Sequence, residues 1–206
     1  MFTKRLRNSE MAAKKNAYRV FERLGDEELI LPYLENSLSA ENWPEKYSIE
    51  VDSSPYTGYG DGWFHPSSHV LMGERELYYT MHPKLKLLRE RERRNLGSNM
   101  TLAMGSALHA VIQTQLVMTG LVSQEDIEIA VKNEIVRGRG NMDWAINHPN
   151  GTRYACEFKT QNSRAFSFQK TPKDEWVGQI NCYMDWAGLD HGIIIVAESG
   201  WPYGIR

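Results

Sequence analysis

Two acidic residues and one lysine flank a predicted hairpin turn and carry most of the chemistry that the sequence offers. Asp143 precedes the turn, and Glu157 and Lys159 follow it. The three residues between His148 and Thr152 are Pro, Asn and Gly. Pro presets φ at the first turn position, Asn tolerates the second, and Gly takes the left-handed conformation that closes the loop. This order predicts a three-residue hairpin loop with a glycine bulge.

The loop length decides which residues face each other across the hairpin. With a three-residue loop, His148 pairs with Thr152, and counting back places Asp143 directly opposite Glu157. A two-residue Asn-Gly turn would instead pair Asp143 with Phe158 and send the two carboxylates to opposite faces.

Strand periodicity then groups the side chains around Glu157. Lys159 lies two residues beyond Glu157 and shares its face, whereas Phe158 points the other way, into the predicted core. Directly opposed Cβ atoms are roughly 4.5–5.5 Å apart, so Asp143 and Glu157 need a cation or a proton between them. Carboxylate oxygens are ligands that Mg²⁺ or Mn²⁺ prefers. A solvated strand face with an ordinary ion pair is the alternative.

The elements that position these residues follow from hydrophobic spacing and breakers. We expect a helix over 101–119 that stops at Gly120, helix or strand over 127–136, strands over 140–147 and 152–160, a helix over 174–187 and a buried strand over 191–198. This order predicts an α/β domain with a mixed sheet. Upstream, we expect a charged helix over 4–25, an irregular connection over 40–66 and a serine-capped helix start near 66–68. The predicted division is therefore a helical extension with a linker, 1–60, and a main domain, 61–206.

Bulk composition excludes little. The net charge is −2, so phosphate binding would depend on local basic patches. Cys156 and Cys182 are too few for a disulfide framework, and no apolar run has the length of a membrane span. We expect a cytoplasmic protein (in the host cytoplasm if phage-encoded) with no membrane partner.

Four short motifs occur in a fixed order between about residues 67 and 196. They are Gly105-Ser-Ala-Leu-His109, Gly140-Asn-Met-Asp143, Glu157-Phe-Lys159 and Gln179-Ile-Asn-Cys-Tyr183. Together they resemble the histidine helix, G-x-x-D, E-x-K and Q-x-x-x-Y motifs of the RecB-like branch of the PD-(D/E)XK nuclease superfamily. The chain departs from the namesake acidic pair because Met142 precedes Asp143. The resemblance implies a restriction-endonuclease-like core, a mixed sheet flanked by helices.

The resemblance also implies a metal site for Mg²⁺ or Mn²⁺. Asp143 and Glu157 would ligate the ion, with His109 and the backbone carbonyl of Phe158 completing the protein donors. Such an ion acidifies bound water and neutralises phosphate charge. His109 is alternatively an ordinary core or surface histidine. Glu134 is a surface carboxylate unless it touches a second metal.

Three further residues receive roles from the resemblance. Lys159 would orient or help to deprotonate the attacking water and steady the scissile phosphate. Gln179 and Tyr183 lie one helical turn apart, hence on one face, and would brace Lys159 and the phosphate. Tyr183 could instead be plain core.

The chain also looks like phage exonucleases and the CRISPR-adaptation (Cas-four type) exonucleases that hold an iron–sulfur cluster. Met72 and Gly73 occupy the neighbourhood where those proteins place their first cluster cysteine. A cubane cluster normally takes four thiolates, and this chain has two cysteines. We therefore expect no iron–sulfur cluster.

Two basic stretches are candidates for binding nucleic acid. One, 84–94, includes Arg91 and Arg94; the other, 161–173, carries Arg164, Phe166, Phe168, Lys170 and Lys173. Aromatic and basic residues interleaved in this way suit base stacking beside a duplex end. The alternatives are a solvated helix surface and a loop anchored by two phenylalanines.

These observations predict a metal-dependent DNA exonuclease that acts on duplex ends or single strands in recombination, repair or phage DNA metabolism. A homo-oligomer or a recombination-protein partner fits that role. An endonuclease on the same fold and a non-catalytic nucleic-acid-binding subunit stay open as alternatives, because core motifs do not define end preference.

Overall fold

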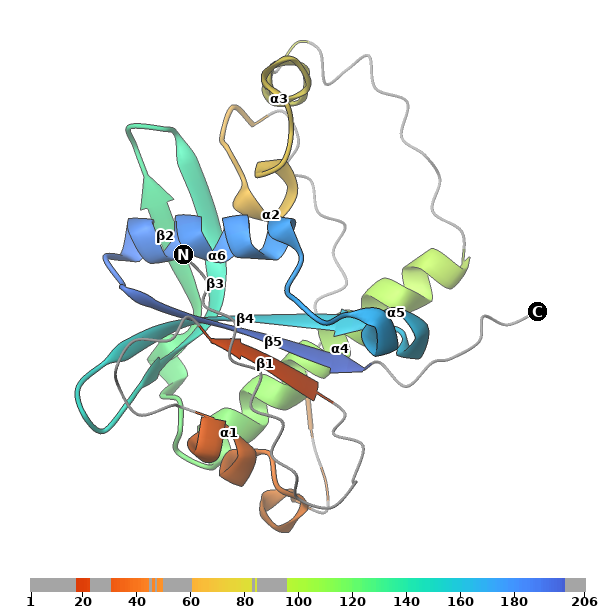
Figure 1. Ribbon diagram of the computed structural model, residues 1–206, viewed down its shortest axis with the longest axis vertical. Coiled ribbons are helices and arrows are strands. Elements are labelled where there is room, and N and C mark those ends of the chain that lie inside the picture. The colour runs from red at the N-terminus through yellow and green to blue at the C-terminus, as the bar shows by residue number, and fades with distance from the viewer. Residues whose placement is uncertain are drawn as a thin grey trace.

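The chain forms an α/β structure around one five-stranded mixed sheet (Figure 1). The computed structural model describes residues 18–22, 31–44, 46, 48–49, 61–82, 84 and 96–198. The strands, in the order β1-β5-β4-β3-β2, are β1 (Tyr18–Glu22), β5 (His191–Glu198), β4 (Arg153–Gln161), β3 (Gly138–Asn147) and β2 (Ile127–Asn133). Neighbouring strands run antiparallel except β4 and β5, which are parallel.

Helices cover both faces of this sheet. They are α1 (Leu31–Ser37), α2 (Pro66–His69), α3 (Glu74–Met81), α4 (Leu96–Met118), α5 (Ser163–Phe168) and α6 (Asp174–Ala187), with 3-10 turns at Ala40–Asn42 and Gln124–Asp126. On the face of α1 and α4, Leu34 and Leu116 pack with Trp144 and Phe158. On the face of α6, Ile180 packs with other apolar residues of that helix and of β5. The sheet is thus buried on both sides, which fixes the register of its strands.

Several predicted elements are confirmed and others need correction. The bounds of α6 and β5 match the predicted ranges, and Gly120 ends the α4 segment with φ of 73°. The segment predicted as helix or strand is the strand β2, and α4 begins at Leu96 rather than at residue 101. A helix begins at Pro66, but its N-cap is His65, without a side-chain cap, rather than a serine. No helix within the described ranges combines the length and the apolar character needed to cross a bilayer.

The N-terminal part differs most from expectation. Residues 18–22, predicted within a helix, form β1 and pair antiparallel with β5, whose outer edge would otherwise leave its N–H and C=O groups unpaired. The other residues of the predicted helix lie outside the described ranges. Leu34 of α1 is fully buried in the core, and the Gln115 side chain of α4 donates to the Ser37 and Asn42 carbonyls at 2.9 Å each. Segments before the predicted division at residue 60 therefore complete the same sheet and core as the segments after it.

Candidate active site

The β3–β4 hairpin has the predicted loop. The His148 N–H donates to the Thr152 carbonyl at 2.8 Å, and Gly151, with φ of 92°, donates to the His148 carbonyl at 2.9 Å. The strand pairing then runs in the same register from Asn147 with Arg153 to Trp144 with Cys156. One further step in this register brings Asp143 opposite Glu157. The three-residue loop is confirmed.

The strands β2 and β3 both change the direction of their side chains at the level of Asp143. Residues two apart share a face in a regular strand, yet in β2 Ile127 packs against the α4 side and Ile129 against the α6 side. Glu128 between them has φ of 51°, a left-handed conformation that is costly for a residue with a Cβ. The change of face in β3 falls at Asp143. The regular alternation of side chains between the two faces of the sheet is therefore interrupted at Asp143.

The two carboxylates are buried and use their oxygens differently. Asp143 and Glu157 are 8% and 2% exposed. The Asp143 Oδ2 accepts from the backbone N–H of Phe158 at 2.6 Å. The Glu157 Oε1 accepts from Lys159 Nζ at 2.6 Å and from Gln179 Nε2 at 2.7 Å. The Glu157 Oε2 is buried without a hydrogen-bond partner among the described residues, and such an orphaned acceptor is a position that a cation would satisfy.

Burial changes the acidity of both groups. Desolvation raises the pKa of Asp143 to about 7, although the Lys159 charge and the Phe158 N–H oppose the rise. Desolvation, and next the charge on Asp143, raise the pKa of Glu157 to about 8 against the opposing effect of Lys159. Two buried acids that repel each other in this way are held ionised at neutral pH only by additional positive charge.

Lys159 is connected to α6 through a side-chain network. Its Nζ lies 3.0 Å from Gln179 Oε1, while Gln179 Nε2 also donates to the Tyr183 hydroxyl at 3.2 Å. Gln179 therefore contacts the lysine, the acid and the tyrosine at once, as the shared helix face predicts. Tyr183 is buried in the core on the α6 side of the sheet and is connected to Lys159 through Gln179.

The close contact between β3 and Tyr183 explains why the G-x-x-D motif has a glycine at position 140. A Cβ placed on Gly140 would lie 2.8 Å from the Tyr183 hydroxyl and ring. Only a residue without a side chain lets β3 approach Tyr183 so closely. The motif glycine of α4 is less constrained, since a Cβ on Gly105 would meet Thr160 at an ordinary 3.5 Å.

His109 of α4 borders the same site. Its Nδ1 is 3.8 Å from Asp143 Oδ1, and its ring packs edge-on against the ring of Phe158 at 4.8 Å. Burial lowers the pKa of His109, while the charge on Glu157 and a backbone hydrogen bond with Phe158 raise it. The imidazole is thereby favoured in the neutral form that a metal ligand requires.

The described residues contain no group of three His, Cys, Asp or Glu side chains that is already arranged around a metal position. Glu157 Oε2 and Asp143 Oδ1 are the carboxylate oxygens that the hydrogen bonds above do not use, and His109 lies beside Asp143. A shared ion with all three donors would therefore require their side chains to move closer together.

Two residues near the acids escaped the sequence analysis. Gln113 Nε2 donates to Glu128 Oε1 at 2.8 Å and lies 3.4 Å from the Asp143 carbonyl. The charge on Glu128 contributes to raising the pKa of Asp143. Gln113 follows His109 by one helical turn, and this spacing is the signal that would have identified it.

Glu134 lies at the surface, with a 72% exposed side chain that pairs with Lys132. Of the two alternatives for this residue, a surface carboxylate and a contact to a second metal, this position fits the first.

The acids line an open cavity of about 660 Å³. Its walls come from β2, β3, β4, α4, α6, and α2 with the residue before it, and the residues are His65, Ser67, His109, Ala130, Val131, Lys132, Arg139, Gly140, Asn141, Asp143, Glu157, Lys159, Gln179 and Tyr183. Three residues that line this cavity, His65, Lys132 and Arg139, were not predicted from the sequence. They come from segments that only the fold brings together.

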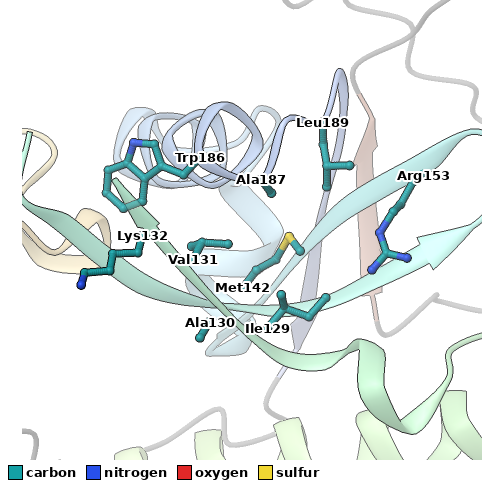
Figure 2. Close-up of a pocket in the computed structure, with 9 residues that line it drawn as sticks. All are labelled: Ile129, Ala130, Val131, Lys132, Met142, Arg153, Trp186, Ala187 and Leu189. Carbon is teal, nitrogen blue, oxygen red and sulfur yellow. The ribbon is translucent and has the colours of Figure 1, made fainter. Parts of the chain in front are cut away.

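A smaller hollow of about 290 Å³ lies beside it, between α6 and the β2–β3 pair (Figure 2). Met142, Val131 and Ile129 line it below Trp186 and Leu189, and its charged residues are Lys132 and Arg153. It contains no carboxylate, so the larger cavity is the candidate active site.

No protein-family model matches the chain, and no curated protein matches it. What the site can do therefore follows from its own geometry.

The predicted nucleic-acid-binding residues divide into two groups. Phe166 is 7% exposed and packs in the core on the α6 side of the sheet, so little of its ring is left for the predicted stacking. Phe168 is 76% exposed and retains a free face. The basic residues of this stretch are also exposed: Arg164, Lys170 and Lys173. Arg91 and Arg94 lie outside the described residues.

Proposed function

We propose that the chain is a metal-dependent nuclease of the PD-(D/E)XK type that hydrolyses phosphodiester bonds at DNA ends. One observation carries the proposal: the buried carboxylates of Asp143 and Glu157 line an open cavity, and the ammonium of Lys159 lies beside Glu157. The antiparallel β2-β3-β4 order, followed by α6 and the parallel strand β5, supports a restriction-endonuclease-like core.

The donor set fits a hard divalent cation. Glu157 offers a buried oxygen without a partner, Asp143 offers Oδ1, and His109 and the Phe158 carbonyl lie beside them. Carboxylate, imidazole and carbonyl donors suit Mg²⁺ and Mn²⁺. A divalent ion held there would neutralise phosphate charge and acidify a water molecule.

Lys159 would act directly on the substrate, and Gln179 would position Lys159. Lys159, fixed by Glu157 and Gln179, places positive charge where it can hold a non-bridging phosphate oxygen and orient the attacking water. The water oxygen forms a bond to phosphorus, one ester P–O bond breaks, and the departing alcohol leaves with a proton. Gln179 keeps Lys159 in place throughout, so little reorganisation is needed during the reaction.

The cavity walls support a phosphate-bearing polymer as substrate. Lys132, Arg139 and His65 line the same cavity as Lys159, although the whole chain is slightly acidic. Several basic side chains around one cavity suit a phosphodiester backbone that passes through it. An open cavity also admits a strand more readily than an enclosed pocket would.

The test is digestion of end-labelled linear DNA and of circular DNA of the same sequence, with Mn²⁺ or Mg²⁺ and with a chelator. We expect stepwise loss of nucleotides from the linear DNA only, and no loss with the chelator present. Cleavage of circular DNA would show an endonuclease instead. No cleavage of linear, forked or single-stranded DNA with either ion would overturn the proposal.

A further inference from the structure

The β2–β3 hairpin carries the most exposed large apolar residue of the described chain. Ile135 at its tip is 94% exposed and Val136 is 54% exposed. We infer that this tip is a wedge that enters the end of a DNA duplex and parts the terminal base pairs, so that one strand reaches Asp143 and Glu157. The inference rests on the proposed function, since it names how a duplex end would be presented to that site.

The tip is held in a defined conformation. The Asn133 side chain accepts from the backbone N–H groups of Ile135 at 3.0 Å and Val136 at 3.3 Å. The Arg137 N–H donates to the Glu134 carbonyl at 3.3 Å, and Arg137 itself adopts a left-handed φ of 50°. These bonds leave the two apolar side chains pointing into solvent from an ordered turn. A preorganised apolar projection of this kind is what proteins use to unstack bases.

The base of the hairpin is braced against the rest of the fold. Figure 1 shows β2 and β3 extending beyond α6, and Figure 2 shows Trp186 of α6 lying over their α6-facing side. A Cβ on Gly138 would lie 2.4 Å from the Trp186 ring, so ring and backbone are in direct contact. Phe64 adds a bridge, with its N–H donating to the Arg137 carbonyl and its carbonyl accepting from the Arg139 N–H. A wedge needs such rigidity because it must transmit force to a base pair rather than bend.

The charges around the tip favour a nucleic acid over an apolar surface. Residues 132–139 include three basic side chains and one acidic side chain. Lys132 and Arg139 lie over the face of Trp63 at 4.6 and 5.7 Å, where their charges also border the cavity. Lys132 pairs with Glu134, and Arg139 with Asp61. Arg137 has no carboxylate within ion-pair distance among the described residues, so it is available for a backbone phosphate.

The hairpin also has a suitable reach. Five residue steps along β3 lead from Gly138 to Asp143, which corresponds to about 17 Å at 3.4 Å per residue. A strand of duplex DNA rises about 3.4 Å per nucleotide and an unpaired strand can extend further, so up to about five nucleotides span this distance. The wedge would therefore open the duplex within about five nucleotides of the cleavage site. A DNA end that is already splayed by that length should bypass the wedge.

The test measures base unstacking without cleavage. A blunt duplex with 2-aminopurine in its terminal pair is bound by the Asp143→Asn protein, which we expect to lack turnover. We expect fluorescence to rise on binding, and the double variant Ile135→Ser/Val136→Ser in the same background to lose most of the rise. Met118→Ser, an exposed apolar residue on α4, is the matched control and should keep it.

A second readout uses active protein with Mn²⁺. The ratio of digestion rates on blunt and on forked DNA with five unpaired nucleotides should fall about tenfold in the double variant, since a wedge offsets part of the cost of unstacking. An unchanged ratio, an unchanged fluorescence rise, or binding of the parent protein with no rise would overturn the wedge. Digestion of forked DNA by the wild type keeps the proposed function in place even then. Failure on every substrate would instead refute the nuclease itself.

Discussion

The carboxylate of Asp143 accepts a hydrogen bond at 2.6 Å from the backbone N–H of Phe158, the residue that follows Glu157 in β4. This bond uses Oδ2 and fixes the carboxylate at the β3–β4 boundary. It leaves Oδ1, which lies 3.8 Å from His109 Nδ1, outside this bond. Phe158 thus positions the site with its backbone while its ring anchors the opposite core.

Removal of either acid should abolish activity while the fold remains. We expect Asp143→Asn and Glu157→Gln each to lower kcat by at least about 100-fold, the loss typical of a removed electrostatic group in an active site. Single-turnover digestion of linear DNA with saturating Mn²⁺ measures the effect. Circular dichroism and thermal melting control for folding. Near-wild-type turnover in either variant would reject the site.

The metal-free protein should lose stability as the pH rises. The folded-state pKa values of Asp143 and Glu157, about 7 and about 8, exceed the ordinary values of 3.8 and 4.5. The native state therefore binds protons that the unfolded chain has already lost, so the free energy of unfolding falls from about pH 4 to about pH 8. Melting curves with a chelator across this range should show the slope.

The Glu157→Gln variant is the control for this dependence. It should melt higher than the wild type near pH 8 without metal, because it buries no second carboxylate. Mn²⁺ should raise the melting temperature of the wild type there and that of the variant much less. A wild-type slope that persists unchanged in the variant would assign the dependence to other groups.

Substitutions in the hydrogen-bond network around Lys159 should lower kcat more when they remove more hydrogen bonds. Gln179→Leu removes contacts to Lys159, Glu157 and Tyr183, and we expect kcat to fall about 10–100-fold. Tyr183→Phe removes only the hydroxyl and should cost less than about tenfold. The split between kcat and KM separates positioning of Lys159 from DNA binding. An equal or larger loss in Tyr183→Phe would contradict the order of these contacts.

His109 should serve the metal rather than the DNA. We expect His109→Ala to weaken Mn²⁺ binding about 10–100-fold, as loss of a ligand or its support does. Calorimetric titration of Mn²⁺ into the variant tests this, with DNA affinity measured in parallel by anisotropy in Ca²⁺. Gln113→Ala, one turn away on α4, is the comparison variant. Equal losses of metal and DNA affinity in His109→Ala would argue against ligation.

The two motif glycines should respond differently to alanine. Gly140→Ala forces a Cβ to 2.8 Å from Tyr183, and we expect a loss of about 1–3 kcal/mol in the free energy of unfolding, as for overpacked sites. Gly105→Ala places its Cβ at 3.5 Å from Thr160 within a helix and should be neutral or stabilising. Denaturant unfolding measures both. An equal change in the free energy of unfolding in the two variants would show that the Tyr183 side chain moves aside at little cost.

The hairpin shows how far local sequence can determine a site. The Pro149-Asn150-Gly151 loop has strict backbone requirements, so its length, and through it the register of Asp143 against Glu157, could be predicted. The helix of Gln179 and Tyr183 could be predicted as well, because apolar periodicity and Gly188, with φ of 66°, bound it clearly. Phe166 shows the limit, since local sequence does not reveal which of two nearby phenylalanines is taken by the core.

The sequence alone thus determined the chemical types and the local geometry of the site: two acids, a lysine and a bracing helix. Only the tertiary structure decided that β1 belongs to the sheet, that Glu128 interrupts β2 beside Asp143, and that Arg139 lines the same cavity as Lys159. Turns and helix faces depend on neighbouring residues and their backbone preferences. Contacts between distant segments depend instead on how buried surfaces and unpaired strand edges are shared across the whole fold, and no short stretch of sequence encodes that.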